Sequence, residues 1–232
     1  KFFNLSNRYE SYYHIYFNDN NNKEIKKKKK IYKDDKVYRI KILIERVIKD
    51  LSYSFKDCKC IQKINFIRFN RKDINNMSNM FTKCTSLEIL NLSKFKTDKV
   101  IDMTNMFYGC KLLKELDLSK FNTSNVNNMK FMFNKCSSLK ELNLSNFNTV
   151  IVMNMKYMFN ECSNLEKLNL SNFNTNNVSN MKYMFNKCSS LKELNLSNYN
   201  NTLVEDMSFM FNECCSLEKL NLIGFKTDNV MI

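Results

Sequence analysis

The chain has 232 residues, 37 of them Lys or Arg and 23 Asp or Glu, and a formal net charge of +14 at pH 7. With one histidine, His14, and two glycines, it cannot assemble a histidine-based catalytic triad, a multi-histidine metal site or the usual glycine-rich phosphate loops. No apolar run approaches the ~20 residues of a membrane-spanning helix. Residues 1–79 hold 20 Lys or Arg against 9 Asp or Glu, so the rest of the chain is nearly neutral.

The first segment, residues 2–17, is rich in aromatic side chains and predicts one or two β-strands. A basic Asn/Lys linker follows, and residues 37–44 then alternate in a way that predicts another strand. Because a repeat array must hide the apolar edge of its first unit from water, residues 1–47 are expected to form a strand-rich cap with a basic linker. Residues 48–232 are expected to form the repeat domain.

The linker ends in a run of five lysines, which is a candidate basic patch: Lys26, Lys27, Lys28, Lys29 and Lys30. Such a run would suit nucleic acid or an anionic membrane. The alternative is a solvated linker in a lysine-biased chain, and it is favoured because no aromatic residues within the run suggest base stacking and no amphipathic helix accompanies it.

From residue 48 onward the sequence repeats every 26 residues without insertion or deletion, giving about seven units. A phenylalanine column shows the period: Phe55, Phe81, Phe107, Phe133, Phe159, Phe185 and Phe211. A cysteine column follows three residues later: Cys58, Cys84, Cys110, Cys136, Cys162, Cys188 and Cys214. The repeat therefore determines the architecture before any local pattern does.

Within one unit, Leu113, Leu116 and Leu118 form an L-x-x-L-x-L pattern that predicts a short strand. The apolar residues in 126–136 recur at helical spacing and predict a helix across from the strand, with residues 123–125 suited to its N-cap. One unit buries about nine apolar side chains, and each burial stabilises the fold by roughly 2 kcal/mol. Ordering the 26 residues of the unit costs about 1.5 kcal/mol of conformational entropy for each residue. The total entropic cost is larger, so a single unit cannot fold alone. The sequence therefore predicts an α/β leucine-rich-repeat solenoid of strand-helix units, stacked into a curved or elongated array.

The cysteine column lies on the apolar face of each unit and lacks the paired spacing of a zinc site, so we interpret it as core. Cys60 and Cys215 lie outside this column. The methionine column is also interpreted as core: Met77, Met103, Met129, Met155, Met181 and Met207. Neither a metal nor a cofactor is expected.

The outward side of the strands is the candidate ligand face, because solenoids present stacked side chains there. It combines a charged column with an amide column: Lys63, Asn65, Asn91, Glu115, Asp117, Glu141, Asn143, Lys167, Asn169, Glu193, Asn195, Lys219 and Asn221. At strand spacing of ~4.8 Å, the asparagines would be either a structural ladder in which each amide bonds the next or a polar ligand surface.

The unit from Asn128 to Thr149 resembles the BspA-like leucine-rich repeats through its M-F-x-x-C, L-x-x-L-x-L-S and F-x-T elements. The resemblance covers residues 48–232. It implies an α/β solenoid on a cell surface with a role in adhesion or host interaction. Ordinary leucine-rich repeats place Asn or Cys where this chain has an aromatic column, and an internal aromatic spine is predicted there: Phe95, Phe121, Phe147, Phe173 and Tyr199.

We therefore expect a non-enzymatic, protein-binding or adhesive repeat module, secreted or at the cell surface, that binds a protein or glycan on its strand face and uses no small-molecule substrate. One alternative is a cytoplasmic leucine-rich-repeat scaffold. Another is binding of anionic lipid or nucleic acid through Lys26 to Lys30. Residues 230–232 begin a repeat that has no room to finish, so the native chain is expected to continue.

Overall fold

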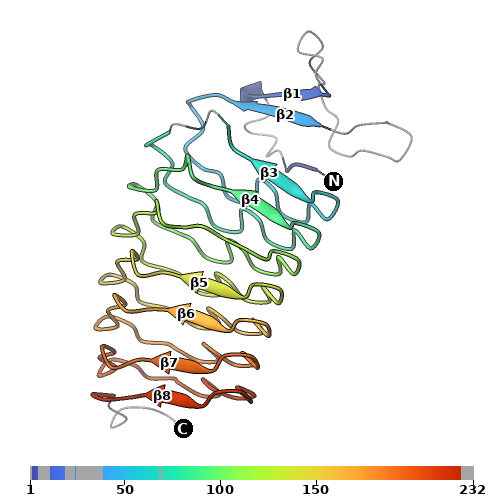
Figure 1. Cartoon of the computed structure of the whole chain (residues 1–232). Helices are drawn as coiled ribbons and strands as arrows, with labels where there is room; N and C mark the ends of the chain where they lie inside the picture. The colour runs from blue at the N-terminus through green and yellow to red at the C-terminus, as the bar shows by residue number, and fades with distance from the viewer. Residues whose placement is uncertain are drawn as a thin grey trace.

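The protein is described by a computed structural model that covers residues 2–4, 11–18, 24, 39–67, 69 and 71–225. It is an elongated stack of coils with a two-stranded sheet at one end (Figure 1). The lysine run at 26–30 and the C-terminal residues 230–232, on which two expectations rest, lie outside the described residues.

The strands of the coils are short and parallel. The end sheet pairs β1 (Tyr13–Phe17) with β2 (Ile40–Ile44) in antiparallel fashion. Six coil strands follow: β3 (Lys63–Asn65), β4 (Ile89–Asn91), β5 (Glu141–Asn143), β6 (Lys167–Asn169), β7 (Glu193–Asn195) and β8 (Lys219–Asn221). They join in three separate parallel pairs, β3 with β4, β5 with β6, and β7 with β8.

We number the coils 1 to 7 by the phenylalanine column, so that coil 4 is residues 126–151, coil 5 is 152–177, coil 6 is 178–203 and coil 7 begins at 204. The strand predicted in coil 3 is not formed, because residues 115–117 make no ladder hydrogen bonds. Leu116 and Leu118 are nevertheless buried, with 9% and 1% of their surface exposed. The apolar pattern therefore fixes which side chains point inward in coil 3, whereas strand pairing depends on the neighbouring coils.

The helix expected over residues 126–136 is absent. That segment is a series of turns, and only residues 11–12 are helical, of the 3-10 type, in the described part of the chain. Alternate N–H groups of the segment leave their own coil and bond carbonyls of the next one: Met129 to Asn154, Phe131 to Lys156, Phe133 to Met158 and Lys135 to Asn160. Three other N–H groups bond three residues back within the coil: Met132 to Met129, Asn134 to Phe131 and Cys136 to Phe133.

An α-helix is impossible under this pattern, because a helix bonds every N–H four residues back and keeps every residue right-handed. Phe131 and Lys135 instead have φ of 58° and 63°. Equivalent left-handed residues recur in every coil, and in coil 3 one of them is Gly109 with φ of 72°. We call this ladder of turns, residues 127–136 in coil 4 and their equivalents, the turn side of the solenoid.

The predicted core columns are buried except in coil 7, where Met207, Phe211 and Cys214 are half-buried. The phenylalanine column forms one continuous stack, whose ring centroids lie 5.5 to 5.8 Å apart and whose planes lie within 13° of parallel. The aromatic spine predicted from Phe95 to Tyr199 is internal, with every ring at most 4% exposed. Stacking of like side chains between coils thus supplies the burial that a single unit lacks.

The interpretation of the cysteine column as core is confirmed. Cys84 donates its Sγ–H to the carbonyl of Phe55, and Cys136 to that of Phe107, at 2.9 and 3.2 Å. Burial raises the pKa of Cys84 and of Cys162 to about 12. These thiols therefore remain protonated and unreactive at neutral pH.

The N-terminal strands pack on the first coil. Phe2 and Phe3 are fully buried, and the ring of Phe3 meets that of Phe55 at 4.9 Å. Arg71 donates to the carbonyls of Glu45 and Arg46 at 2.9 and 2.6 Å, which ties the segment after β2 to the far end of coil 1. The apolar edge of coil 1 is thereby covered.

Candidate functional site

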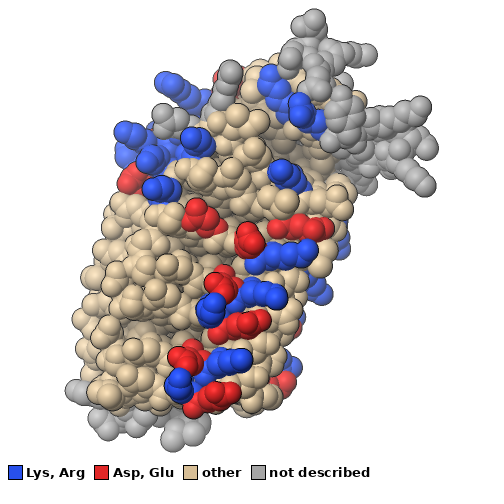
Figure 2. Space-filling model, viewed as in Figure 1, with Lys and Arg blue, Asp and Glu red and all other residues tan. Residues whose placement is uncertain are grey.

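The residues of the expected ligand face lie on the coil strands and at the equivalent positions of coil 3. Of the predicted residues from Lys63 to Asn221, all are exposed except Asn221, which is half-buried. Of the leucines between them, Leu142 and Leu194 are 3% exposed, whereas Leu168 is half-buried and Leu220 is 38% exposed. In Figure 2 acidic and basic side chains form a stripe along the solenoid, beside a broad surface that carries no charged side chains.

Four charged members of this face form two pairs across neighbouring coils. Lys167 contacts Glu141 at 2.5 Å, and Lys219 contacts Glu193. Hydrogen bonding to the facing carboxylate raises the pKa of Lys167 and likewise that of Lys219. We name these four residues the charged stripe.

The asparagines of this face do not form a ladder in which each side-chain amide bonds the next. From Asn91 onward, each asparagine Oδ1 instead accepts the backbone N–H two residues later in its own coil, for example from Ser145 to Asn143 and from Ser197 to Asn195, both at 3.0 Å. In coil 3 the same bonds, donated by the backbone and the hydroxyl of Ser119, lower the pKa of Asp117. The asparagines thus stabilise turns, and no amide-to-amide hydrogen bond joins this column in the described residues.

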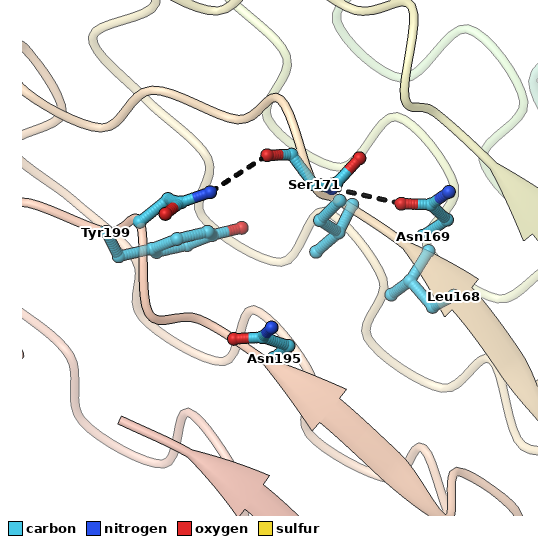
Figure 3. Close-up of a pocket in the computed structure, with 7 residues that line it drawn as sticks. Leu168, Asn169, Ser171, Asn195 and Tyr199 are labelled. Carbon is cyan, nitrogen blue, oxygen red and sulfur yellow. Dashed lines mark hydrogen bonds between the residues drawn. The ribbon is translucent and has the colours of Figure 1, made fainter. Parts of the chain in front are cut away.

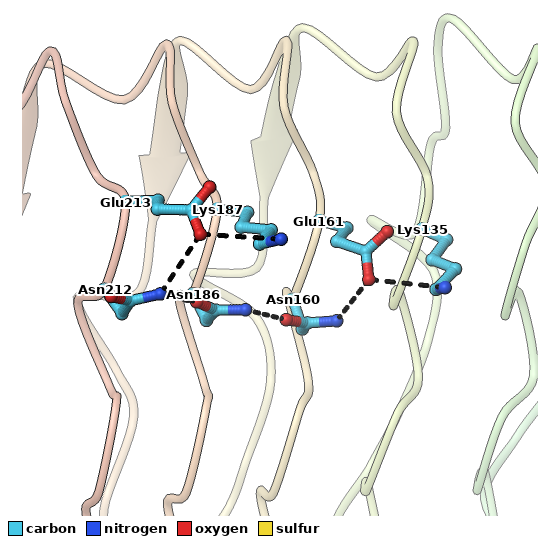
Figure 4. A network of polar contacts seen from close by, with 7 residues as sticks. All are labelled: Lys135, Asn160, Glu161, Asn186, Lys187, Asn212 and Glu213. Carbon is cyan, nitrogen blue, oxygen red and sulfur yellow. Dashed lines mark hydrogen bonds and ion pairs between the residues drawn. The ribbon is translucent and has the colours of Figure 1, made fainter.

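An amide ladder does exist on the turn side, where the sequence analysis did not place it. Asn160 donates to Asn134 at 2.9 Å, Asn186 to Asn160 at 2.5 Å and Asn212 to Asn186 at 2.7 Å. Figure 4 shows Asn160, Asn186 and Asn212 of this line beside the ion pairs of Lys135 with Glu161 and Lys187 with Glu213. The sequence feature that could have predicted this ladder is the Asn that directly follows the core phenylalanine in every coil from coil 4 onward.

A period of two coils is superimposed on the repeat. On the charged stripe the residues alternate as Glu141, Lys167, Glu193 and Lys219, and on the turn side as Lys135, Glu161, Lys187 and Glu213, a period of 52 residues. The described ion pairs among coils 4 to 7 accordingly join coil 4 to coil 5 or coil 6 to coil 7. The strand pairs β5–β6 and β7–β8 join the same coils.

On its strand side, the junction between coils 5 and 6 therefore differs from the junctions on either side of it, because β6 and β7 are not paired. A cavity of about 220 Å³ opens there (Figure 3). Its lining residues come from both coils: Leu168, Asn169, Leu170, Ser171, Asn195, Asn198 and Tyr199. Asn169 and Asn195 had been predicted for the ligand face, whereas Tyr199 had been assigned only to the spine.

A column of partly exposed aromatic residues was also missed. Phe131, Tyr157, Tyr183 and Phe209 stack with centroids 4.7 to 4.8 Å apart, at positions whose φ is positive. The Nζ of Lys156 lies 5.4 Å from the centroid of the Tyr157 ring. Because these rings already cover each other's faces, the column stabilises the turn side.

The other candidate features are scattered. His14 contacts Glu24 and Glu45 in the N-terminal segment, and the hydrogen bond to Glu45 is the largest cause of its raised pKa. Cys60 and Cys215 are exposed. The described residues contain no cluster of three or more His, Cys, Asp or Glu side chains able to hold a metal ion. Nor does any helix in the described ranges have the length and apolar character to cross a bilayer.

Comparison with known proteins identifies a family. The model of the family described as "Mycoplasma protein of unknown function, DUF285" matches residues 49–144 and 132–232. No curated protein sequence matches the chain.

Two solved structures are similar to this chain. One is a leucine-rich repeat protein from Bacteroides ovatus, with 19% identity and a TM-score of 0.44 over 73% of this chain and 39% of that one. The other is a TLR13-ssRNA13 complex, with 17% identity and a TM-score of 0.32 over 69% of this chain and 28% of that one. The chain thus spans well under half the length of either structure.

Proposed function

The chain belongs to the family described as Mycoplasma protein of unknown function, DUF285, and we propose that it is a non-enzymatic binding module that holds a protein ligand on the charged stripe. The observation that carries this proposal is the fixed spacing of the stripe. The buried Leu142 and Leu194 hold β5 and β7 in place, and alternating Glu and Lys side chains lie on the paired strands above them.

Such a surface is suited to recognition. Exposed ion pairs add little to the stability of a fold, so the charges on the stripe are available to a partner at little cost. A partner protein would bind when its charged side chains lie opposite residues of opposite charge on the stripe, because like charges placed opposite each other are unfavourable. A rigid solenoid also loses little conformational entropy on binding.

The reactive groups of the chain support a non-enzymatic role. Its one histidine, His14, already pairs with two glutamates far along the chain from the charged stripe. The buried cysteines have raised pKa values and are therefore poor nucleophiles.

A quadruple alanine variant tests the proposal. E141A/K167A/E193A/K219A removes the charged stripe, and K135A/E161A/K187A/E213A removes the same number of lysines and glutamates from the same coils on the turn side. Both variants should unfold close to the wild-type temperature. In an affinity capture from host and bacterial surface proteins, the wild type and the turn-side variant should retain the same partner, and the stripe variant should lose it. Retention by the stripe variant would overturn the proposal.

Display at the cell surface is the second part of the proposal, and it is supported by the resemblance of residues 128–149 to BspA-like repeats. Intact cells expressing the whole gene should lose the protein on brief external proteolysis while a cytoplasmic marker survives. A protein that is degraded only after cell lysis would instead support the cytoplasmic scaffold.

A further inference from the structure

One residue of the internal aromatic spine carries a polar group. Coils 2 to 5 place phenylalanine in this column, and coil 6 places Tyr199. The Tyr199 side chain is 2% exposed, and its hydroxyl has no hydrogen-bond partner among the described residues. An unpaired buried hydroxyl is unfavourable relative to the phenylalanine used elsewhere in the column.

This hydroxyl lies at the cavity between coils 5 and 6. Figure 3 shows it directed toward the space that Leu168, Ser171 and Asn195 border. The cavity exists because the strand ladder is interrupted there: Leu144 N–H bonds Asn169 O between coils 4 and 5, and Leu196 N–H bonds Asn221 O between coils 6 and 7. No equivalent bond joins Leu170 to Asn195 in the described chain.

The lining offers several uncharged hydrogen-bonding groups. Asn169 and Asn195 use their Oδ1 atoms within their own turns, which leaves both Nδ2 groups as donors. Asn198 uses Nδ2 to bond Ser171 O at 3.0 Å, which leaves its Oδ1 as an acceptor. The Tyr199 hydroxyl both donates and accepts. Leu168 and Leu170 supply an apolar wall.

We propose that this cavity binds one ring of a neutral saccharide, with the Tyr199 hydroxyl and the three asparagine amides bonding sugar hydroxyls and the leucines contacting the C–H face. The inference goes beyond the proposed protein binding, since the cavity and the charged stripe use different residues. The sugar would lie at the junction between coils 5 and 6, where β6 and β7 are not paired.

The charge and size of the cavity select this ligand class. No Lys, Arg, Asp or Glu lines it, so an ionic ligand would lose hydration without gaining an opposite charge. A volume of about 220 Å³ accommodates a group the size of a single ring rather than a folded partner. A sugar ring combines alternating hydroxyl donors and acceptors with an apolar face, which matches this lining.

The test uses the full chain and the methyl glycosides of glucose, galactose, mannose and N-acetylglucosamine, each titrated to millimolar concentration and followed by amide NMR signals. At least one glycoside should shift signals of residues 168–171 and 195–199. Tyr199→Phe should weaken that affinity roughly 3- to 10-fold, as expected for loss of one neutral hydrogen bond. Tyr183→Phe, which removes a hydroxyl of the same coil outside the cavity, should leave it unchanged.

Three results would overturn the inference: no glycoside shifts these signals, Tyr199→Phe binds as tightly as wild type, or methyl glucuronide binds more tightly than methyl glucoside. The thermal midpoint without sugar is an independent readout. Tyr199→Phe should equal or exceed the wild type, and a clearly lower midpoint would show that the hydroxyl has a protein partner. Sugar binding should persist in the stripe variant, which separates this inference from the proposed protein binding.

Discussion

Coils 5 and 6 are joined differently on the two sides of the solenoid. On the turn side the ladder continues through the junction: Tyr157 and Phe159 bond carbonyls of coil 6, and Asn186 bonds Asn160. On the strand side β6 and β7 are unpaired, and a cavity lies between them. The turn side therefore provides the continuous structural connection between these coils, whereas the strand side is open at this junction.

The largest effect is expected from breaking the turn-side stack at this junction. Phe159 is fully buried and stacks on Phe133 and Phe185 at 5.5 Å. Phe159→Ala should lower the free energy of unfolding by about 3–5 kcal/mol, measured by urea titration with circular dichroism. Tyr157→Ala, in the partly exposed stack, is the control and should cost less. A loss below about 1 kcal/mol for Phe159→Ala would contradict the central role of the stack.

A matched pair of leucines compares two junctions on the strand side. Leu142 in β5 is 3% exposed, whereas Leu168 at the same position of β6 is half-buried and lines the cavity. Leu142→Ala should cost about 2–5 kcal/mol, and Leu168→Ala should cost at least about 1 kcal/mol less. Equal losses in urea titrations would indicate that the strand side is closed at both places.

The amide ladder offers a smaller perturbation of the turn side. Asn160 is 4% exposed and bonds both Asn134 and Asn186. Asn160→Leu would leave two buried amide groups without their partner and should cost about 1–3 kcal/mol. Asn143→Leu, which removes only an exposed turn contact, should cost less. The thermal midpoints of the two variants in one buffer would decide the order.

The smallest effect is expected from a substitution at a residue whose backbone is in the left-handed conformation. Gly109 has φ of +72°, and an added Cβ would meet Lys83 Cγ at an ordinary 3.5 Å. Gly109→Ala should therefore cost about 1 kcal/mol from backbone strain alone. Gly109→Asn should recover most of this, because asparagine tolerates the left-handed region. A destabilised Asn variant would point to steric crowding instead.

Much of this architecture can be predicted from sequence because burial repeats with the chain. The columns through Phe133, Cys136 and Leu142 follow from their 26-residue spacing, and each of these side chains is at most 3% exposed. The helix could not be rejected in the same way, since residues 126–136 have helical apolar spacing in either conformation. The helix is excluded because alternate N–H groups of this segment bond carbonyls of coil 5. The spacing of apolar residues within one coil does not predict such a bond between coils.

The site was harder to predict for a related reason. The alternation of Glu141, Lys167, Glu193 and Lys219 is present in the sequence, but its meaning depends on which strands pair. Tyr199 differs from Phe173 by one oxygen, and only the gap between β6 and β7 gives that atom a role. Sequence columns identify inward and outward positions, whereas the junctions between coils are tertiary features.

Amide hydrogen exchange, measured residue by residue, tests the difference between the two sides most directly. The amides of Leu144 and Leu196, which bond the next coil, should exchange slowly, as should those of Tyr157 and Phe159 on the turn side. The amide of Leu170, at the interrupted junction, should exchange much faster than these four. Protection of Leu170 equal to that of Leu144 and Leu196 would contradict the division of the strand side into pairs of coils.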